Sequence, residues 1–144
     1  MSDPRGRKPV TAVDTTPQPP LGKPRMPSGL DSIAKAEWKR VLPMLDAMGI
    51  TSKIDGTILE LYCRMYSRWQ LAERTLAKEG FEKECANGYN QLNVWSGIGN
   101  NAIKTMRDCM DELGMTPKSR QKLKALPRPR PEAAKWNKLL KVAQ

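Results

Sequence analysis

The residue types that most often carry catalysis or bind metals are scarce in this chain, and they stand far apart. The sequence contains no histidine, which removes the commonest general base and the commonest metal ligand. The chain has three cysteines, Cys63, Cys85 and Cys109, which lie 22 and 24 positions apart. An odd number at this spacing argues against a disulfide framework or a zinc knuckle and favours a reducing compartment.

Phosphate chemistry and carboxylate chemistry have equally little support. Gly97 and Gly99 in "WSGIGNN" are followed by no Lys-Ser or Lys-Thr pair, so a P-loop is not expected. The acidic residues alternate with basic ones along the faces of predicted helices, which is typical of solvated surface. We therefore predict that the chain is not an enzyme and that it needs no cofactor and no metal.

The chemistry that the sequence favours is the binding of a polyanion. The formal charge is +10, and residues 115–144 alone hold nine Lys and Arg against one acid. Residues 1–30 carry +3, whereas residues 31–114 have 11 basic and 12 acidic side chains and are close to neutral. A neutral body with cationic ends suits the neutralisation of phosphates. Basic ends that only keep the protein soluble are the alternative.

The elements that must position these cations begin after an N-terminal arm. Residues 1–30 hold seven of the twelve prolines and few large apolar side chains, which predicts a disordered, basic, Pro-rich arm. The arm lacks the apolar stretch of a signal peptide, and the chain has no run of about 18 apolar residues. We expect a protein that is neither exported nor membrane-spanning.

The periodicity of the apolar residues predicts three helices and an all-α fold. The first begins at Asp31 or Ser32, ends at Gly49 and is kinked at Pro43. The second runs from Thr51 or Ser52 to Gly80 and the third from about residue 95 to 113, together forming a long antiparallel α-hairpin. Asn87-Gly88 between them predicts a small β-hairpin near residues 81–91. The second helix has a 4, 3, 4, 3, 4 seam of apolar residues: Ile58, Tyr62, Met65, Trp69, Ala72 and Leu76.

Self-association follows from the same pattern, because the second helix is apolar over more of its circumference than one neighbouring helix can cover. We expect an oligomer whose interface uses large side chains of the two long helices. The predicted interface residues are Tyr62, Met65, Tyr66, Trp69 and Trp95.

A basic hairpin follows the third helix. Leu113-Gly114 ends that helix, and Thr116-Pro117 supplies an N-cap hydroxyl and a proline for a short helix over residues 117–126. Residues 31–126 are thus the predicted helical core and oligomerisation domain. Residues 127–144 are predicted to be a Pro/Arg spacer and a C-terminal amphipathic helix.

Several stretches resemble the small subunits of bacteriophage terminases, in particular the group often encoded beside an HNH endonuclease. They are "RGRKP", "AKAEWKRVLPML", "LYCRMYSRW", "NGYNQLN" and above all "ELGMTPKSRQKL", and the resemblance covers roughly residues 5–126. Met115 stands where a leucine is more usual, and Asn93-Val94 stands where an asparagine-proline is typical. Because no proline follows Asn93, the family pattern does not fix the predicted start of the third helix.

The resemblance implies a ring-forming homo-oligomer that recognises viral double-stranded DNA near its packaging site. The ring would deliver this DNA to the large terminase subunit, which holds the ATPase and nuclease activities, and would regulate it. The residues expected to contact phosphates or the minor groove are Arg5, Arg7, Lys8, Lys118, Arg120, Lys122, Lys124, Arg128 and Arg130. The apolar face of the C-terminal helix, Trp136, Leu139 and Leu140, would dock onto the large subunit, with packing within the chain as the alternative.

Two other hypotheses remain open at this point. The sharp turn at residues 113–117 is also compatible with a dimeric helix-turn-helix transcriptional regulator, which would be distinguished by its stoichiometry. A structural or adaptor protein of the phage particle would be found in purified virions. A packaging factor would instead reside in the cytoplasm of the infected bacterial host and be absent from the mature virion.

Overall fold

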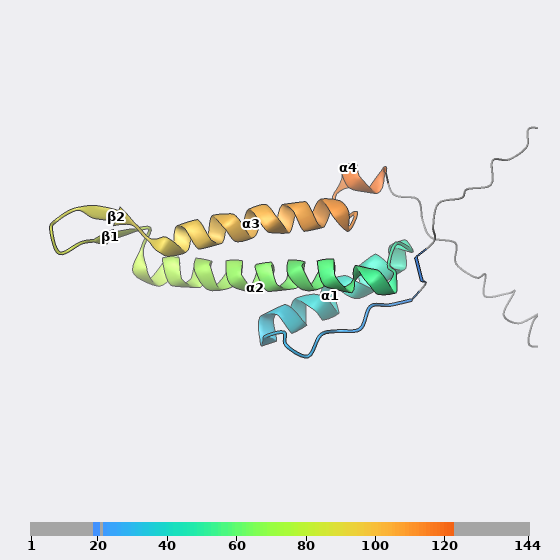
Figure 1. The fold of residues 1–144 in the computed structure, drawn as a ribbon. Helices are drawn as coiled ribbons and strands as arrows, with labels where there is room; N and C mark the ends of the chain where they lie inside the picture. Colours follow the sequence, from blue (N-terminus) through green and yellow to red (C-terminus); the bar gives the residue numbers. More distant parts are fainter. Residues whose placement is uncertain (1–18, 21, 123–144) are drawn as a thin grey trace, which may run out of the picture.

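The architecture is an antiparallel pair of long helices with a third helix packed on one of them. The computed structural model describes residues 19–20 and 22–122. Its elements are α1 Ser32–Met48, a 3₁₀ turn η1 Lys53–Asp55, α2 Gly56–Glu79, strands β1 Glu82–Glu84 and β2 Asn90–Leu92, α3 Val94–Glu112 and α4 Pro117–Arg120. Figure 1 shows α2 and α3 side by side, α1 against α2, the β-hairpin at one end and α4 at the other. The predicted helical fold and small β-hairpin are confirmed.

Helix α1 has the ends that the sequence predicts. The Asp31 side chain accepts a hydrogen bond of 2.9 Å from the backbone N–H of Ala34, which caps the first turn. At the other end Gly49 adopts φ 74°, a left-handed conformation that favours glycine. Pro43 lies inside this helix.

The connection to α2 is a tight capped turn. Oδ2 of Asp55 accepts hydrogen bonds from the backbone N–H of Ser52 at 2.7 Å and from its hydroxyl at 2.9 Å. One 3₁₀ turn follows, and the α-helix itself begins at Gly56 and ends before Gly80. The helical segment thus begins after Ser52, one of the two predicted positions, but its first turn is 3₁₀ and the α-helix starts at Gly56.

The core lies where α2 meets both other helices. Of the predicted seam, Tyr62, Ala72 and Leu76 are buried. Leu59 and Cys63 are just as deeply buried, because α2 contacts α3 with one side and α1 with another. The two long helices approach closely near Gly99, where an added Cβ would lie 3.3 Å from Cβ of Ala72.

A buried polar network joins α1 to α2. Glu37 is only 3% exposed, and its carboxylate accepts a 2.9 Å hydrogen bond from the hydroxyl of Tyr62. Arg40 forms a two-pronged ion pair with the same carboxylate, with Nε at 2.8 Å and Nη2 at 2.5 Å. Burial and the hydrogen bond to Glu37 raise the pKa of Tyr62, so it stays a neutral donor.

The β-hairpin extends from the far end of α2 and α3. Glu82 pairs with Leu92 and Glu84 with Asn90, and every strand residue is exposed. Gly88 donates to the carbonyl of Cys85 at 2.9 Å and has φ 77°, which makes a type I turn followed by a left-handed glycine.

Asn93 anchors this hairpin and starts α3. The side-chain NH₂ of Asn93 donates to Glu79 at 3.2 Å and to the backbone carbonyl of Gly80 at 3.1 Å. Its side-chain oxygen Oδ1 accepts from the backbone N–H of Trp95 at 3.1 Å. Helix α3 therefore begins one residue before the predicted position, and an asparagine cap serves without a following proline.

The last part of the predicted N-terminal arm contacts the helices. Leu30 is 4% exposed in the core, the carbonyl of Pro20 accepts from Lys53 N–H at 3.1 Å, and Lys23 forms a 3.2 Å ion pair with Asp46. Residues 1–18 and 21 lie outside the described residues.

Candidate nucleic-acid interface

The turn between α3 and α4 fixes the basic end of the chain to the core. Gly114 adopts φ 66°, and the N–H of Met115 donates to the carbonyl of Met110 at 2.8 Å. This is a Schellman-type helix ending, and it is completed by a 3.3 Å bond from Gly114 N–H to the carbonyl of Asp111. The direction of the chain after α3 is therefore set by backbone hydrogen bonds.

The cap of α4 strengthens the same junction. Oγ1 of Thr116 accepts from the N–H of Ser119 at 3.2 Å, and the Ser119 hydroxyl lies 3.2 Å from Thr116 N–H as its acceptor. The Thr116 hydroxyl also donates to Asp111 at 2.8 Å, which links the new helix to the last turn of α3. Pro117 occupies the first helical position, as predicted.

Three of the predicted DNA-binding cations are presented by this element. Lys118 and Arg120 lie in α4 and Lys122 in the turn that follows, and all three are exposed. Within residues 19–20 and 22–122 none of them has an ion-pair partner. Within the described part of the chain, no acidic side chain neutralises these three charges.

Helix α4 begins where the predicted helix over residues 117–126 begins. It ends at Arg120, and Gln121 and Lys122 form a turn. The local cap at Thr116 starts the helix, and residues 123–126 of its predicted extent lie outside the described residues. The remaining predicted DNA-binding residues lie outside the described residues: Arg5, Arg7, Lys8, Lys124, Arg128 and Arg130. The same holds for the predicted docking residues Trp136, Leu139 and Leu140.

The predicted oligomer interface is spread over several environments. Met65, Tyr66, Trp69 and Trp95 are half-buried, and the rings of Tyr66 and Trp69 meet edge to face at 5.8 Å. Tyr62 is 5% exposed and already bonded to Glu37, so its contacts are within the subunit. The interface set stays a prediction.

Two exposed leucines of α2 were not singled out from the sequence. Leu61 is 41% and Leu71 50% exposed on a helix whose other large apolar residues are packed. They fall outside the 3-4 seam, and the pattern assigned them to no partner. The sequence signal was only that both are large apolar residues outside this seam.

The opposite end of the molecule differs in charge from α4. Phe81, Tyr89, Leu92 and Val94 are all 64% exposed or more, and Glu79, Glu82 and Glu84 lie beside them with Lys83 as the one cation of residues 79–103. An acidic, apolar surface repels phosphates. DNA contact is therefore expected at the α4 end.

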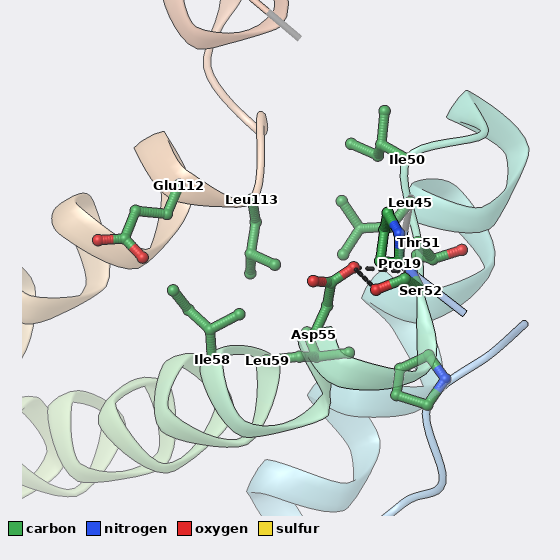
Figure 2. A pocket seen from close by; sticks show the side chains of 11 residues that line it. Pro19, Leu45, Ile50, Thr51, Ser52, Asp55, Ile58, Leu59, Glu112 and Leu113 are labelled. Carbon is green, nitrogen blue, oxygen red and sulfur yellow. Dashed lines mark hydrogen bonds between the residues drawn. The ribbon is translucent and has the colours of Figure 1, made fainter. Parts of the chain in front are cut away.

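A pocket lies at the α4 end of the core, between the α1–α2 connection and the last turn of α3. We call it the end pocket (Figure 2), and its volume is about 270 Å³. Ile58 on α2 and Leu113, directly after α3, point into it, and the Asp55 carboxylate lies beside Ser52. Glu112 also lines the pocket, with its carboxylate extending away from Asp55. The full lining is Pro19, Pro24, Leu45, Ile50, Thr51, Ser52, Asp55, Ile58, Leu59, Glu112 and Leu113.

The described residues do not assemble a reactive centre. Burial raises the pKa of the Cys63 thiol to about 12 and also raises that of Cys109, which keeps both protonated at neutral pH. Among residues 19–20 and 22–122 no three His, Cys, Asp or Glu side chains cluster as metal ligands do. No helix of this part is long and apolar enough to cross a membrane.

Comparison with known proteins identifies the family. Neither a curated protein nor a solved structure shows significant similarity to the chain. A family model described as phage terminase, small subunit, matches residues 34–130, which is 97 of the 144 residues. The match runs from the first turn of α1 past α4 and includes the capped turn that presents the cations. The chain therefore belongs to the small-subunit family of phage terminases.

Proposed function

We propose that this chain recognises viral double-stranded DNA as a homo-oligomeric ring, recruits it for packaging, and delivers it to the large terminase subunit, whose ATPase and nuclease it regulates. Membership of the family gives the chain a role in phage DNA packaging. The observation that carries the finer proposal is the rigid junction at Thr116, which presents Lys118, Arg120 and Lys122 at one end of a nearly neutral body.

Contact between these cations and phosphates would position the duplex without selecting a sequence. Each neutralised phosphate releases condensed counterions. The logarithm of the binding constant therefore falls with the logarithm of the salt concentration, with a slope of roughly 0.9 per phosphate contact. Three cations per subunit give weak binding alone. A ring multiplies them, because sites held together bind a continuous polymer at a high effective concentration.

Assembly into a ring is supported by the apolar surface that one subunit leaves uncovered. Leu61 and Leu71 are exposed on α2, and Trp69 and Trp95 are only half-buried. Contact with a second copy would remove this surface from water. The protein would act as a non-catalytic factor in the host cytoplasm and leave before the virion matures.

The C-terminal helix provides the proposed link to the large subunit. Trp136, Leu139 and Leu140 share one face at helical spacing and follow a Pro/Arg spacer. Truncation after Ala125 tests this link. Loss of large-subunit ATPase stimulation is expected, and retained stimulation would remove the docking role.

The DNA-binding role is tested by reversing the three charges. The triple variant Lys118→Glu, Arg120→Glu, Lys122→Glu should bind packaging-site DNA more weakly and lower the salt slope by about 3 per participating subunit. The measurement is fluorescence anisotropy of labelled duplex at several salt concentrations.

A matched triple variant controls for total charge. Lys78, Lys83 and Lys104 are exposed, lack ion-pair partners in the described part of the chain, and lie away from α4. Substitution of all three by Glu makes the same change in net charge and should preserve most of the salt dependence of DNA binding. Equal loss in both variants would show that only total charge matters and would end the assignment to α4.

The dimeric regulator has less support than the ring. A four-residue α4 rises about 6 Å, whereas the major groove is about 12 Å wide, so α4 is short for a recognition helix. Light scattering coupled to size exclusion separates a dimer from a ring of many subunits. Mass spectrometry of purified virions tests the adaptor hypothesis.

A further inference from the structure

We propose that the end pocket binds the C-terminal segment of the same chain, residues 133–144, when the large subunit is not bound. The segment's sequence is "AAKWNKLLKVAQ". The proposal rests on the proposed function only in naming the large subunit as the competing partner. It assigns to the pocket a ligand that is part of the protein.

The lining of the pocket is largely apolar, so its contact with water is unfavourable. Leu45, Leu59 and Leu113 form its deep part and are 7% exposed or less, and Ile50 and Ile58 are half-buried at its sides. A volume of about 270 Å³ leaves room for water over this apolar lining. Replacing such water with an apolar side chain is favourable, and tryptophan is the side chain that buries the most area.

The charges at the edge select the basic C-terminal segment. Glu112 makes no hydrogen bond or ion pair with the described residues, and Oδ1 of Asp55 is left open because both Ser52 bonds go to Oδ2. The segment carries three lysines and no acidic side chain; at helical spacing Lys135 flanks the apolar face, whereas Lys138 and Lys141 lie on the far side. The acidic lining thus favours a basic segment over an acidic one.

The N-terminal arm is the weaker candidate for the same pocket. Apart from Met1, the largest apolar side chains of residues 1–18 are Val10 and Val13, which bury far less area than Trp136 with two leucines. The acidic β-hairpin of another copy is also disfavoured, because it would bring Glu82 and Glu84 toward Glu112. Of these three candidates, the C-terminal segment is the one that combines large apolar groups with a net positive charge.

The length of the chain permits this contact. Lys122 follows α4, at the same end of the molecule as the end pocket (Figure 1). Trp136 lies 14 residues further on. A chain of 14 residues has a root-mean-square span of roughly 20 Å when flexible and about 43 Å when extended like polyproline. Pro127, Pro129 and Pro131 restrict where the segment can turn but do not shorten its reach.

Competition for one apolar face follows directly. The face formed by Trp136, Leu139 and Leu140 cannot contact the pocket and the large subunit at once. An intramolecular ligand on a short tether has an effective concentration in the millimolar range. The large subunit must therefore bind the segment strongly enough to displace it, and until then the apolar face is kept from non-specific contacts.

Hydrogen–deuterium exchange of the full-length protein tests the proposal. In the wild type, amides of residues 133–144 and those lining the pocket at residues 50–55 should exchange slowly. Trp136→Ala should raise exchange in both regions by about tenfold or more, since it removes the largest buried group. Asn137→Ala, which lies off the apolar face, is the matched control and should leave both unchanged.

Charge reversal at the pocket edge gives a reciprocal test. Glu112→Lys should raise exchange of residues 133–144 by about threefold, as expected for one surface ion pair. Glu84→Lys makes the same change at the β-hairpin and should have no effect. Full exchange of the segment in the wild type, or protection that Trp136→Ala leaves intact or transfers to another surface, would overturn the proposal. Neither result bears on DNA affinity or on large-subunit stimulation, which are measured separately.

Discussion

Removal of one hydroxyl tests the buried network between α1 and α2. Tyr62→Phe deletes the donor that lies 2.9 Å from the Glu37 carboxylate and keeps the ring that packs in the core. Glu37 is 3% exposed, so water cannot replace the lost donor without opening the helix interface. Arg40 remains as the other partner of the carboxylate.

The size of the effect follows from the charge on the acceptor. A hydrogen bond to a charged group contributes about 1.5 to 3 kcal/mol, more than a neutral pair. Unfolding entropy of about 2.1 cal/mol/K per residue over roughly 100 residues converts 1 kcal/mol into a melting shift of about 5 °C. Tyr62→Phe should therefore lower the melting temperature by about 7 to 15 °C.

Circular dichroism melts at one fixed protein concentration measure this shift, because assembly makes the melting temperature depend on concentration. Tyr66→Phe is the control, since Tyr66 is half-buried on the same helix and its hydroxyl has no hydrogen bond with the described residues. That variant should melt within about 2 °C of the wild type. Equal shifts in the two variants, or a shift below about 2 °C for Tyr62→Phe, would refute the reasoning.

Three further predictions concern single positions. Asp31→Ala should lower the free energy of unfolding in urea at pH 7 by about 1 kcal/mol, whereas Asp31→Asn keeps the cap. The hydrogen bond from Ala34 N–H lowers the pKa of Asp31 below 3.8, so the charged cap stabilises the fold above that pH. The deficit of Asp31→Ala should therefore vanish at lower pH, where the carboxylate of the wild type is protonated. Gly97→Ala should raise the free energy of unfolding by about 0.5 to 1 kcal/mol in the same assay, since the new Cβ meets open space. Gly99→Ala should raise it less, or lower it, because the new Cβ would crowd Ala72 of α2. Iodoacetamide at pH 8 should modify Cys85 well before Cys63, whose pKa is raised to about 12; equal labelling in peptide mass spectra would contradict the buried position of Cys63.

Element boundaries were largely predictable because they depend on local hydrogen bonds. Asp31 and Thr116 each cap their helix through a residue three positions later. Asn87-Gly88 forms the hairpin turn through contacts within five residues. Such signals are present in any short window of sequence, and the structure confirms them.

Features that depend on distant residues were not predictable. Glu37 had the appearance of a surface acid, and its burial becomes visible only when Tyr62, 25 positions away, is placed beside it. Cys63 was left off the predicted seam because a single 3-4 pattern describes one partner helix and α2 has two. The cap of α4 was predictable because it is local; the described helix ends at Arg120, and residues 123–126 of the predicted helix lie outside the described residues.

The candidate site was predictable in composition more than in geometry. The sequence indicated that Lys118, Arg120 and Lys122 follow a sharp turn, and the structure shows them exposed and without ion-pair partners in the part that it describes. The end pocket was not anticipated, because its walls come from four separate stretches between Pro19 and Leu113. An interface between copies depends on surfaces of two chains, and the periodicity of one chain cannot specify it.

The β1–β2 hairpin offers a practical attachment point. Its strands are exposed on both faces, and the hydrogen bonds of Asn93 to Glu79, Gly80 and Phe81 hold its base independently of the loop. A short epitope or a fluorophore inserted between Asn87 and Gly88 would extend away from the helices at the end opposite α4 (Figure 1). Such a label would let single-particle images or energy-transfer measurements assign the polarity of the molecule on DNA without altering Lys118, Arg120 or Lys122.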